Sequence, residues 1–406
     1  MLRKSASFFD QLVVSGGNFA LTIFLARALS TEDFGFFSIS WLIVISLASL
    51  IQAVFIAPML SLTPKFSEVD QKRFCSLLFL ELIITITLLS SCILSLFFIA
   101  KYLNYIDVTT ILFGLLFLSP SYYLYEFLRR DLMLRGENLF LLISDILCYG
   151  LILATILLSE TIELNSVFLV VSSCFTLTIV VLSFKSRFEL FRVIKDFKSY
   201  RSLVIKQYDF SKWLVKSSIL QFFNGNAYVL ITGFFLGVAQ VAYLKMAQNI
   251  VGIINPIYVF LDNHAQLYLA KTRFEKGEDA CNKEYVKIVI ACMSCLILVL
   301  STIYIFRTNI ILFIYDEQPD VIYVYLALML VLSAFTGANF LQRLIIKVRE
   351  DTKVIYKSYV YSSVLSLLAV YPLITLYGGL AAVQAMIIAQ AVMLFVLLSE
   401  KNKPTK

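Results

Sequence analysis

Charged residues and histidine are scarce in this chain. Only 15% of its 406 residues are charged, and it has a single histidine, which excludes a metal cluster built on several imidazoles. It also lacks a glycine-rich phosphate-binding loop, a helical HExxH motif and any extramembrane segment long enough for a catalytic or nucleotide-binding domain. The sequence therefore predicts a protein that is not an enzyme, has no cofactor or metal, and does not drive transport with ATP by itself.

Cysteine is present but scattered. Five of the seven cysteines lie within apolar segments, and Cys292 and Cys295 form a CxxC in the middle of an apolar helix without flanking metal ligands. We expect these cysteines to be small packing residues. No cleavable signal peptide is expected either, because Met1–Asp10 is short and leads directly into an apolar segment.

Apolar residues dominate the composition of the chain. They make up 60% of the chain and give a mean hydropathy of +0.86, above that of a soluble domain of this size. They gather into segments of about twenty residues, the length that crosses about 30 Å of hydrocarbon. We predict an all-α membrane protein with twelve transmembrane helices at 10–29, 36–60, 77–100, 108–127, 139–158, 164–184, 213–236, 241–263, 285–306, 321–342, 355–376 and 378–398.

The positive charges alternate along this pattern. Every second gap between the segments, with its flanking turns, holds Lys and Arg, and these gaps together contain 29 of the 34 basic residues. Such a bias marks the cytoplasmic side, so both termini are predicted to be cytoplasmic in a multi-pass membrane protein. The bias also accounts for the net charge of +7, so no nucleic-acid partner is expected.

The longest polar segment divides the chain into two halves. We predict a six-helix lobe at 1–184, a basic cytoplasmic linker at 185–212 with eight Lys and Arg, and a second six-helix lobe at 213–406. Apolar residues recur every three positions in the linker, which fits either a helix lying on the membrane surface or a simple tether. These residues are Phe188, Phe191, Ile194 and Phe197.

The two halves carry matching polar stripes. In each, four polar residues are spaced four, three and four apart, so they share one helix face, and the two sets are 206 residues apart. This favours a parallel repeat with polar faces turned to water or protein, although chance and interhelical hydrogen bonding give the same pattern. The residues are Gln11, Ser15, Asn18 and Thr22 in the first half, and Ser217, Gln221, Asn224 and Tyr228 in the second.

Three basic residues within or at the ends of spans are candidate binding groups. Lys245 lies within the eighth predicted span, one turn before Asn249, and needs either a water-filled cavity or a side chain that reaches the outer interface. Lys216 at the inner end of the seventh span fits the charge bias as well as a site. Arg27 ends the first span on the outer side, where it is either an interfacial anchor or, if the Gly16–Gly17 pair kinks the helix or its terminal turn unwinds, a cavity residue.

Asp145 is the acidic residue placed deepest in a span. A carboxyl group there is either a proton-coupling site or a neutral hydrogen-bonding group. The other acids in spans or at their inner margins are Asp10, Glu81, Glu126 and Asp262.

The opening stretch FFDQLVVSGGNFALTIFLARALSTEDFGFFSISW resembles the start of the polysaccharide transporter (O-antigen flippase) family. The matching features are Asn18, the ARxL sequence at Ala26–Leu29, and the acidic turn Glu32–Gly35 before the second span. The six-plus-six layout resembles the larger multidrug/oligosaccharidyl-lipid/polysaccharide (MOP) exporter superfamily. GVAQVAYLKMAQNI is similar to the entry of that family's eighth span, although Lys245 is less usual there.

The resemblance implies two six-helix lobes around a central cavity, and a cargo of oligosaccharide repeat units on a polyprenyl diphosphate for O-antigen, lipopolysaccharide or another surface polysaccharide. It implies that cationic residues meet the diphosphate, so our candidates are Arg27, Lys216 and Lys245. Polar residues would meet sugar hydroxyls, and the candidates are Asn18, Gln221, Asn224 and Asn249. A polysaccharide polymerase and a chain-length regulator are the partners expected besides membrane lipids.

Three other functions stay open. A multidrug or small-cation antiporter has the same architecture but needs acidic groups for cationic drugs, whereas the candidate groups here are mainly basic. A membrane-embedded polymerase or ligase needs a sizeable external loop, whereas the longest loop here is predicted to be cytoplasmic. A scaffold without transport activity in a polysaccharide assembly complex is the third.

Overall fold

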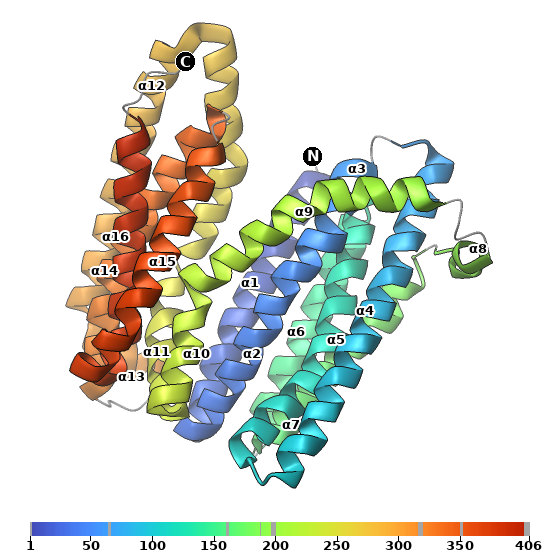
Figure 1. The fold of residues 1–406 in the computed structure, drawn as a ribbon, viewed down its shortest axis with the longest axis horizontal. Coiled ribbons are helices and arrows are strands. Elements are labelled where there is room, and N and C mark those ends of the chain that lie inside the picture. Colours follow the sequence, from blue (N-terminus) through green and yellow to red (C-terminus); the bar gives the residue numbers. More distant parts are fainter. Residues whose placement is uncertain are drawn as a thin grey trace. The chain divides into compact units, whose positions relative to one another are not determined.

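In the computed structural model, the residues described are 2–63, 66–159, 162–186, 188–195, 200–315, 320–349 and 352–401, and these residues form helices joined by short turns, without strands. Two compact units, Met1–Ile219 and Leu220–Lys406, divide the chain. The helices are α1 Leu2–Ala28, α2 Thr31–Ile51, η1 Gln52–Ile56, α3 Ala57–Leu62, α4 Glu68–Tyr102, α5 Ile106–Leu134, α6 Asn138–Leu158, α7 Leu164–Ser183, α8 Leu190–Lys195, α9 Arg201–Asn224, α10 Asn226–Leu236, α11 Val238–Gly252, α12 Asn255–Ile305, α13 Arg307–Tyr315, α14 Asp320–Val348, α15 Thr352–Tyr377, η4 Gly378–Leu380 and α16 Ala381–Lys401 (Figure 1).

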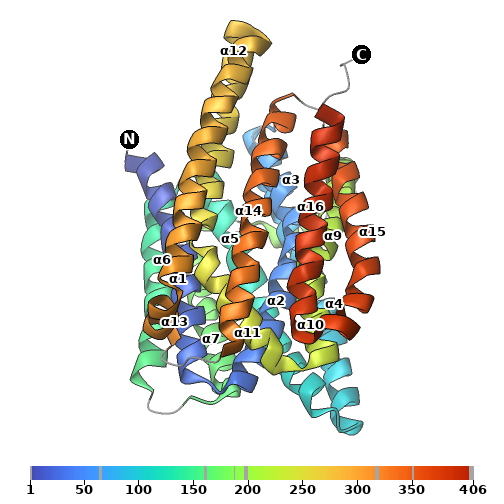
Figure 2. The same cartoon turned by 90° about the vertical axis from the view of Figure 1, so that its left-hand side faces the viewer.

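The predicted all-helical membrane architecture is confirmed. Among the described residues, nine stretches of helix are long and apolar enough to cross a membrane, and a tenth is added if α9 and α10, bent by 44° at their junction, form one span. One of the nine, Lys353–Ser399, contains both α15 and α16, which lie side by side (Figures 1 and 2). The 15 residues of α11 are fewer than a crossing needs. The count of twelve and the cytoplasmic termini stay predictions.

Short capping motifs set where the helices of unit 1 begin. The Ser30 hydroxyl accepts a hydrogen bond from the backbone N–H of Asp33 at 3.1 Å and donates one to its carboxylate at 2.8 Å, which caps α2. Ser67 and Asp70 repeat the arrangement at α4. The acidic turn on which the family resemblance partly depends is therefore also a helix cap.

Glycines in unit 1 let helices approach closely. An added Cβ at Gly17 in α1 would lie 2.5 Å from ring atoms of Tyr149 in α6, and one at Gly114 in α5 would lie 2.6 Å from the ring of Phe168 in α7. α1 is a single helix through Gly16 and Gly17. Gly17 is thus a packing residue, and the helix is continuous there.

We expect Gly17→Ala to destabilise the folded protein by about 1–3 kcal/mol, since the Cβ would overlap the base of the Tyr149 ring. The matched control is Gly16→Ala, where nothing lies within 4 Å of an added Cβ. That change should be neutral or raise stability by about 0.5–1 kcal/mol through helix propensity. Thermal unfolding of the two purified variants in detergent measures the difference, and equal melting temperatures would contradict this packing.

The linker at 185–212, for which the sequence allows a surface helix or a simple tether, is helical in part. α8 has six residues, with Phe191 92% exposed and Ile194 61% exposed, while Val193 is buried in a small cluster with Leu77. The Phe188 ring stacks on Phe79 at 4.2 Å between centroids. The rest of the linker from Arg201 belongs to α9, and Phe197 lies outside the described residues.

In unit 2, the predicted gap at 264–284 is helical and not a loop. α12 runs through it and reverses at Gly277, whose φ of 83° is in the left-handed region that glycine adopts readily (Figure 1). The Glu278 carboxylate joins this bend to α14, since it accepts hydrogen bonds from Arg273 at 2.7 Å and from Arg349 at 2.8 Å. Arg273 also donates to the Val348 carbonyl at 2.8 Å.

Candidate functional site

A cluster of ionised side chains is buried within unit 1, around Arg129 of α5. The guanidinium lies 2.6 Å from the Asp10 carboxylate of α1, 2.7 Å from Asp145 of α6 and 3.4 Å from Glu126. The Tyr125 hydroxyl donates to the second Asp145 oxygen at 2.7 Å. The Arg129, Asp10 and Asp145 residues are 3%, 5% and 0% exposed, so each charge depends on its partners for compensation.

The cluster has more acid than base. Three carboxyl groups (Asp10, Glu126 and Asp145) face two guanidinium groups, since Arg130 also contacts Glu126 at 3.5 Å. One oxygen of Asp10, Oδ1, is buried and has no hydrogen-bond partner among the described residues. Complete ionisation would leave one negative charge in excess, which a single proton can neutralise.

Sequence reasoning missed Arg129. The fifth helix was predicted from 139, and the fourth was predicted to end at 127, which placed Arg129 in a cytoplasmic gap; α5 instead continues to Leu134. Two signals pointed to the cluster. Glu126 and Arg129 are three residues apart and share one helix face. Acids within the first, fourth and fifth spans or at their margins also require a cation.

Asn18 and Arg27, the candidate residues of α1, lie on different parts of that helix. Asn18 is half-buried, and its Oδ1 atom is buried and has no hydrogen-bond partner among the described residues. Arg27 is exposed in the last turn of the helix. Gln11 donates to Ser15 at 3.3 Å, which confirms that these two stripe residues share a face.

The seventh-span candidates all lie on α9, before the break at Gly225. Lys216 is exposed, with its ammonium 4.3 Å from the centroid of the Trp213 ring, and Gln221 is also exposed. Asn224 is 4% exposed, and its amide donates to Ser362 of α15. The Asn224 side chain is therefore engaged inside unit 2, as expected for a polar face turned to protein.

Tyr228 continues this contact. It is fully buried and its hydroxyl is hydrogen-bonded to Ser366, one turn after Ser362 on α15. Asn224 and Tyr228, the last two residues of the second polar stripe, thus form interhelical hydrogen bonds, which is one of the alternatives that the sequence allows.

Lys245 lies in the middle of α11. Its ammonium donates to Gln248 at 2.9 Å, one turn further along the same helix, and it has no acidic partner among the residues that the structure describes. Asn249 is half-buried beside it, and its amide Nδ2 makes no hydrogen bond of normal geometry within the described ranges. The nearby Tyr315 hydroxyl donates instead to the Met246 carbonyl, at 2.9 Å. The Lys245 ammonium, a group suited to an anionic ligand, therefore lies one turn from a buried amide that neighbours the Tyr315 hydroxyl.

The candidates divide between the two units. Asn18, Arg27, Lys216 and Asp145 belong to unit 1, and Gln221, Asn224, Lys245 and Asn249 belong to unit 2. Within the described residues, no group of three or more His, Cys, Asp or Glu side chains could hold a metal ion. The acids that do gather surround Arg129.

Comparison with known proteins shows the fold. No protein family model and no curated sequence matches the chain. Among solved structures, the lipid II flippase MurJ in an inward closed conformation is similar over 99% of this chain and 87% of its own, with 15% identity and a TM-score of 0.70. An inward-facing multidrug resistance MATE transporter of the MOP superfamily is similar over 94% of this chain and 92% of its own, with 11% identity and a TM-score of 0.72.

A third similar structure is a MOP superfamily transporter from Pyrococcus furiosus, reported with a binding pocket of reversed polarity. It has 12% identity and a TM-score of 0.65, and covers 98% of this chain and 93% of its own. The chain therefore has the fold of MOP-type multi-pass membrane transporters, as the six-plus-six layout indicated. The resemblance to the O-antigen flippase family in particular stays a prediction.

Proposed function

We propose that this protein is a flippase that moves polyprenyl-diphosphate-linked oligosaccharide repeat units from the cytoplasmic to the outer leaflet of a bacterial inner membrane. The observation that carries the proposal is Lys245, a cation without an acidic partner among the described residues, in an apolar helix of a MOP-type fold. A lysine is costly there unless it meets water or an anion. The diphosphate is such an anion, and Arg27 and Lys216 are further candidates to contact it.

The physical chemistry of the cargo explains why a protein is needed. Sugar hydroxyls and a diphosphate lose their hydrogen bonds to water in hydrocarbon, which costs several kcal/mol for each unsatisfied group. Polar side chains can replace part of that hydration, and we propose Asn18, Gln221, Asn224 and Asn249 for this task. Of these, Asn18 and Asn249 each have a buried polar atom that a rearrangement would have to expose, and Asn224 would first have to release Ser362.

We also propose the topology that the charge bias predicts, with twelve spans and both termini in the cytoplasm. In that orientation an inside-negative membrane potential favours outward movement of an anion, by about 2.3 kcal/mol per charge for each 100 mV. Transport proceeds by alternating access. The product would serve the synthesis of O-antigen or another surface polysaccharide, with a polymerase and a chain-length regulator as downstream partners.

Asp145 is our proposed coupling residue, acting with Asp10. The Arg129 cluster has one carboxyl group more than its two guanidinium groups can neutralise. Release of one proton therefore changes the net charge of the cluster from zero to −1, and binding of a proton restores it to zero. That change alters how strongly α1 and α6 are held to α5. The same proton can therefore shift the unit between two arrangements of these helices.

Asp145→Asn should reduce transport driven by a pH gradient in vesicles by about tenfold, while transport driven by membrane potential alone should change little. The amide keeps the shape of the side chain and removes its proton exchange. The control is Glu137→Gln, an exposed acid paired with Lys185 at 2.8 Å. An unchanged dependence on the pH gradient in Asp145→Asn would leave this carboxyl group with a structural role only.

The alternative cargo is a cationic drug or small cation, because the fold is shared with multidrug transporters. Ligand-induced stabilisation separates the two cargoes, since a bound ligand raises the melting temperature according to its concentration and affinity. We expect polyprenyl diphosphate oligosaccharide to stabilise the purified protein, and cationic dyes to leave it unchanged. Stabilisation by the dyes alone would favour the antiporter.

A further inference from the structure

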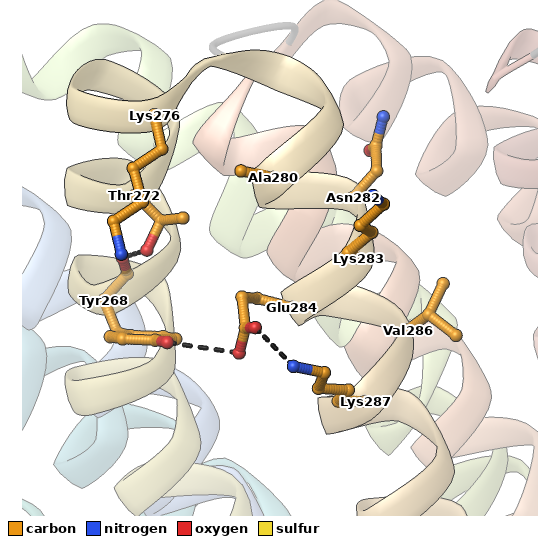
Figure 3. Close-up of a pocket in the computed structure, with 9 residues that line it drawn as sticks. All are labelled: Tyr268, Thr272, Lys276, Ala280, Asn282, Lys283, Glu284, Val286 and Lys287. Carbon is orange, nitrogen blue, oxygen red and sulfur yellow. Dashed lines mark hydrogen bonds and ion pairs between the residues drawn. The ribbon is translucent and has the colours of Figure 1, made fainter.

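A groove lies between the two arms of α12, beside the bend at Gly277 (Figure 3). The arms pack against each other, since the Cys281 thiol is buried and lies 3.6 Å from the Leu269 carbonyl. The groove has a volume of about 540 Å³, within the range of small-ligand sites. Its polar lining comes from Tyr268, Thr272 and Lys276 on the first arm and Lys283, Glu284 and Lys287 on the second.

The charges that line the groove favour an anion. Three lysines face a single acid, Glu284, whose carboxylate is occupied by Lys287 at 2.7 Å and by the Tyr268 hydroxyl at 3.1 Å. Lys276 and Lys283 are exposed and have no hydrogen-bond or ion-pair partner within the described part of the chain. Figure 3 shows Lys276 directed along its arm toward Thr272, and Lys283 on the opposite arm beside Asn282, while Glu284 and Lys287 reach from that arm toward Tyr268.

Two of the other acids near the bend are held elsewhere. Glu278 is bound by Arg273 and Arg349 outside the groove, and Glu275 lies 3.7 Å from Lys271, which does not line the groove. Asp279 at the bend is exposed, and Glu284 is influenced by the charge of Lys276, but the lining itself has three lysines and one acid and so keeps an excess of positive charge. An anionic group that enters the groove meets these lysines directly.

The floor of the groove is apolar, and it lies where the chain turns from polar to apolar. Ala280, Val286 and the Tyr268 ring line it, and the sequence from 288 onward is an uninterrupted apolar segment. Phe274 on the first arm is 92% exposed. Exposed aromatic rings beside lysines are typical of the boundary between head groups and acyl chains, where a lysine stem lies on apolar surface and its ammonium meets phosphate.

We propose that this groove binds the phosphate head group of an anionic membrane phospholipid, with Lys276 and Lys283 on the phosphate and the apolar floor against the start of the acyl chains. A bilayer lipid fits better than a soluble anion because the groove combines unpaired cations with apolar surface at the membrane boundary. The site is independent of the transported cargo and would tie the bend of α12 to the membrane surface.

The test uses the purified full-length protein in detergent, with lipid binding followed by native mass spectrometry and thermal stabilisation. The variant is Lys276→Gln/Lys283→Gln, and the control is Lys212→Gln/Lys271→Gln, which removes two exposed, acid-paired lysines outside the groove. Wild-type protein and control should bind phosphatidylglycerol in preference to phosphatidylcholine. The groove variant should bind phosphatidylglycerol about tenfold more weakly, since each lysine near a lipid phosphate contributes substantially.

Equal phosphatidylglycerol binding by the groove variant and the control would overturn the proposal. Two further arms identify the source of the anion. Inorganic phosphate at millimolar concentration should not displace the lipid, and displacement would make the groove a soluble-anion site. Polyprenyl diphosphate should not compete at equal concentration; preferential binding of it, lost in the groove variant, would make the groove a cargo site instead.

Discussion

Arg129→Met should prevent the protein from accumulating in the membrane, or should lower its melting temperature far more than the loss of an exposed charge does. The substitution removes the cation between Asp10 and Asp145 and leaves two buried carboxylates that are 5% and 0% exposed. Breaking a buried ion pair by removing one partner costs about 3–5 kcal/mol. Membrane abundance and thermal unfolding of the purified variant measure the loss.

Arg130→Met is the matched control, one residue further along α5. Its side chain is 25% exposed and forms an ion pair with Glu126 at 3.5 Å, so we expect a change within about 1 kcal/mol. The triple variant Asp10→Asn/Arg129→Met/Asp145→Asn should recover part of the lost stability, because it leaves no unpaired charge at these positions. Wild-type stability of Arg129→Met, or no recovery in the triple variant, would contradict the cluster as described.

Lys245→Ala should reduce transport of the lipid-linked cargo by about ten- to a hundredfold while the protein folds and reaches the membrane normally. A charge-assisted hydrogen bond to a phosphate contributes about 1.5–3 kcal/mol, and the alanine variant has nothing to replace it. The Lys245 ammonium bonds only to Gln248 of its own helix among the described residues, so little folding energy is lost. Surface polysaccharide in cells and cargo transport in vesicles give the two readouts.

Two companion variants separate charge from structure at this position. Lys245→Arg keeps the positive charge and should retain most of the transport. Gln248→Ala removes the hydrogen-bond acceptor of Lys245 without removing the cation, so it should have a small effect. The sequence also allows a Lys245 side chain that only extends to the membrane interface. In that case Lys245→Ala should transport normally, and Lys245 would not belong to the binding site.

Much of the fold could be predicted from the sequence because apolar run length and charge alternation are set by the membrane itself. The starts of α6 and α7, at Asn138 and Leu164, lie within one residue of the predicted 139 and 164. The parts that were missed depend on polar residues that continue a helix beyond its apolar run. α5 extends seven residues past the predicted 127, and α12 fills the predicted gap 264–284 with helix.

The candidate site could be predicted less well, because a polar residue in a span gives the same sequence signal whether it binds cargo or another helix. Asn224 and Asn249 belong to the same predicted class, yet the first is engaged by Ser362 of another helix and the second has a buried amide beside Tyr315. Asp145 was recognised as important, but its partner Arg129 was assigned to the polar gap. Only the arrangement of α1, α5 and α6 brings the two together.

The most direct test measures transbilayer movement of a fluorescent polyprenyl-diphosphate oligosaccharide in vesicles that contain only this protein. A quencher is added on the side of the bilayer where the labelled lipid starts, and lipid that has crossed the bilayer is protected from it. The proposed function predicts protein-dependent movement that Lys245→Ala abolishes or strongly reduces and Lys245→Arg preserves. Absence of movement by correctly folded wild-type protein, with efflux of a cationic dye from the same vesicles, would contradict it.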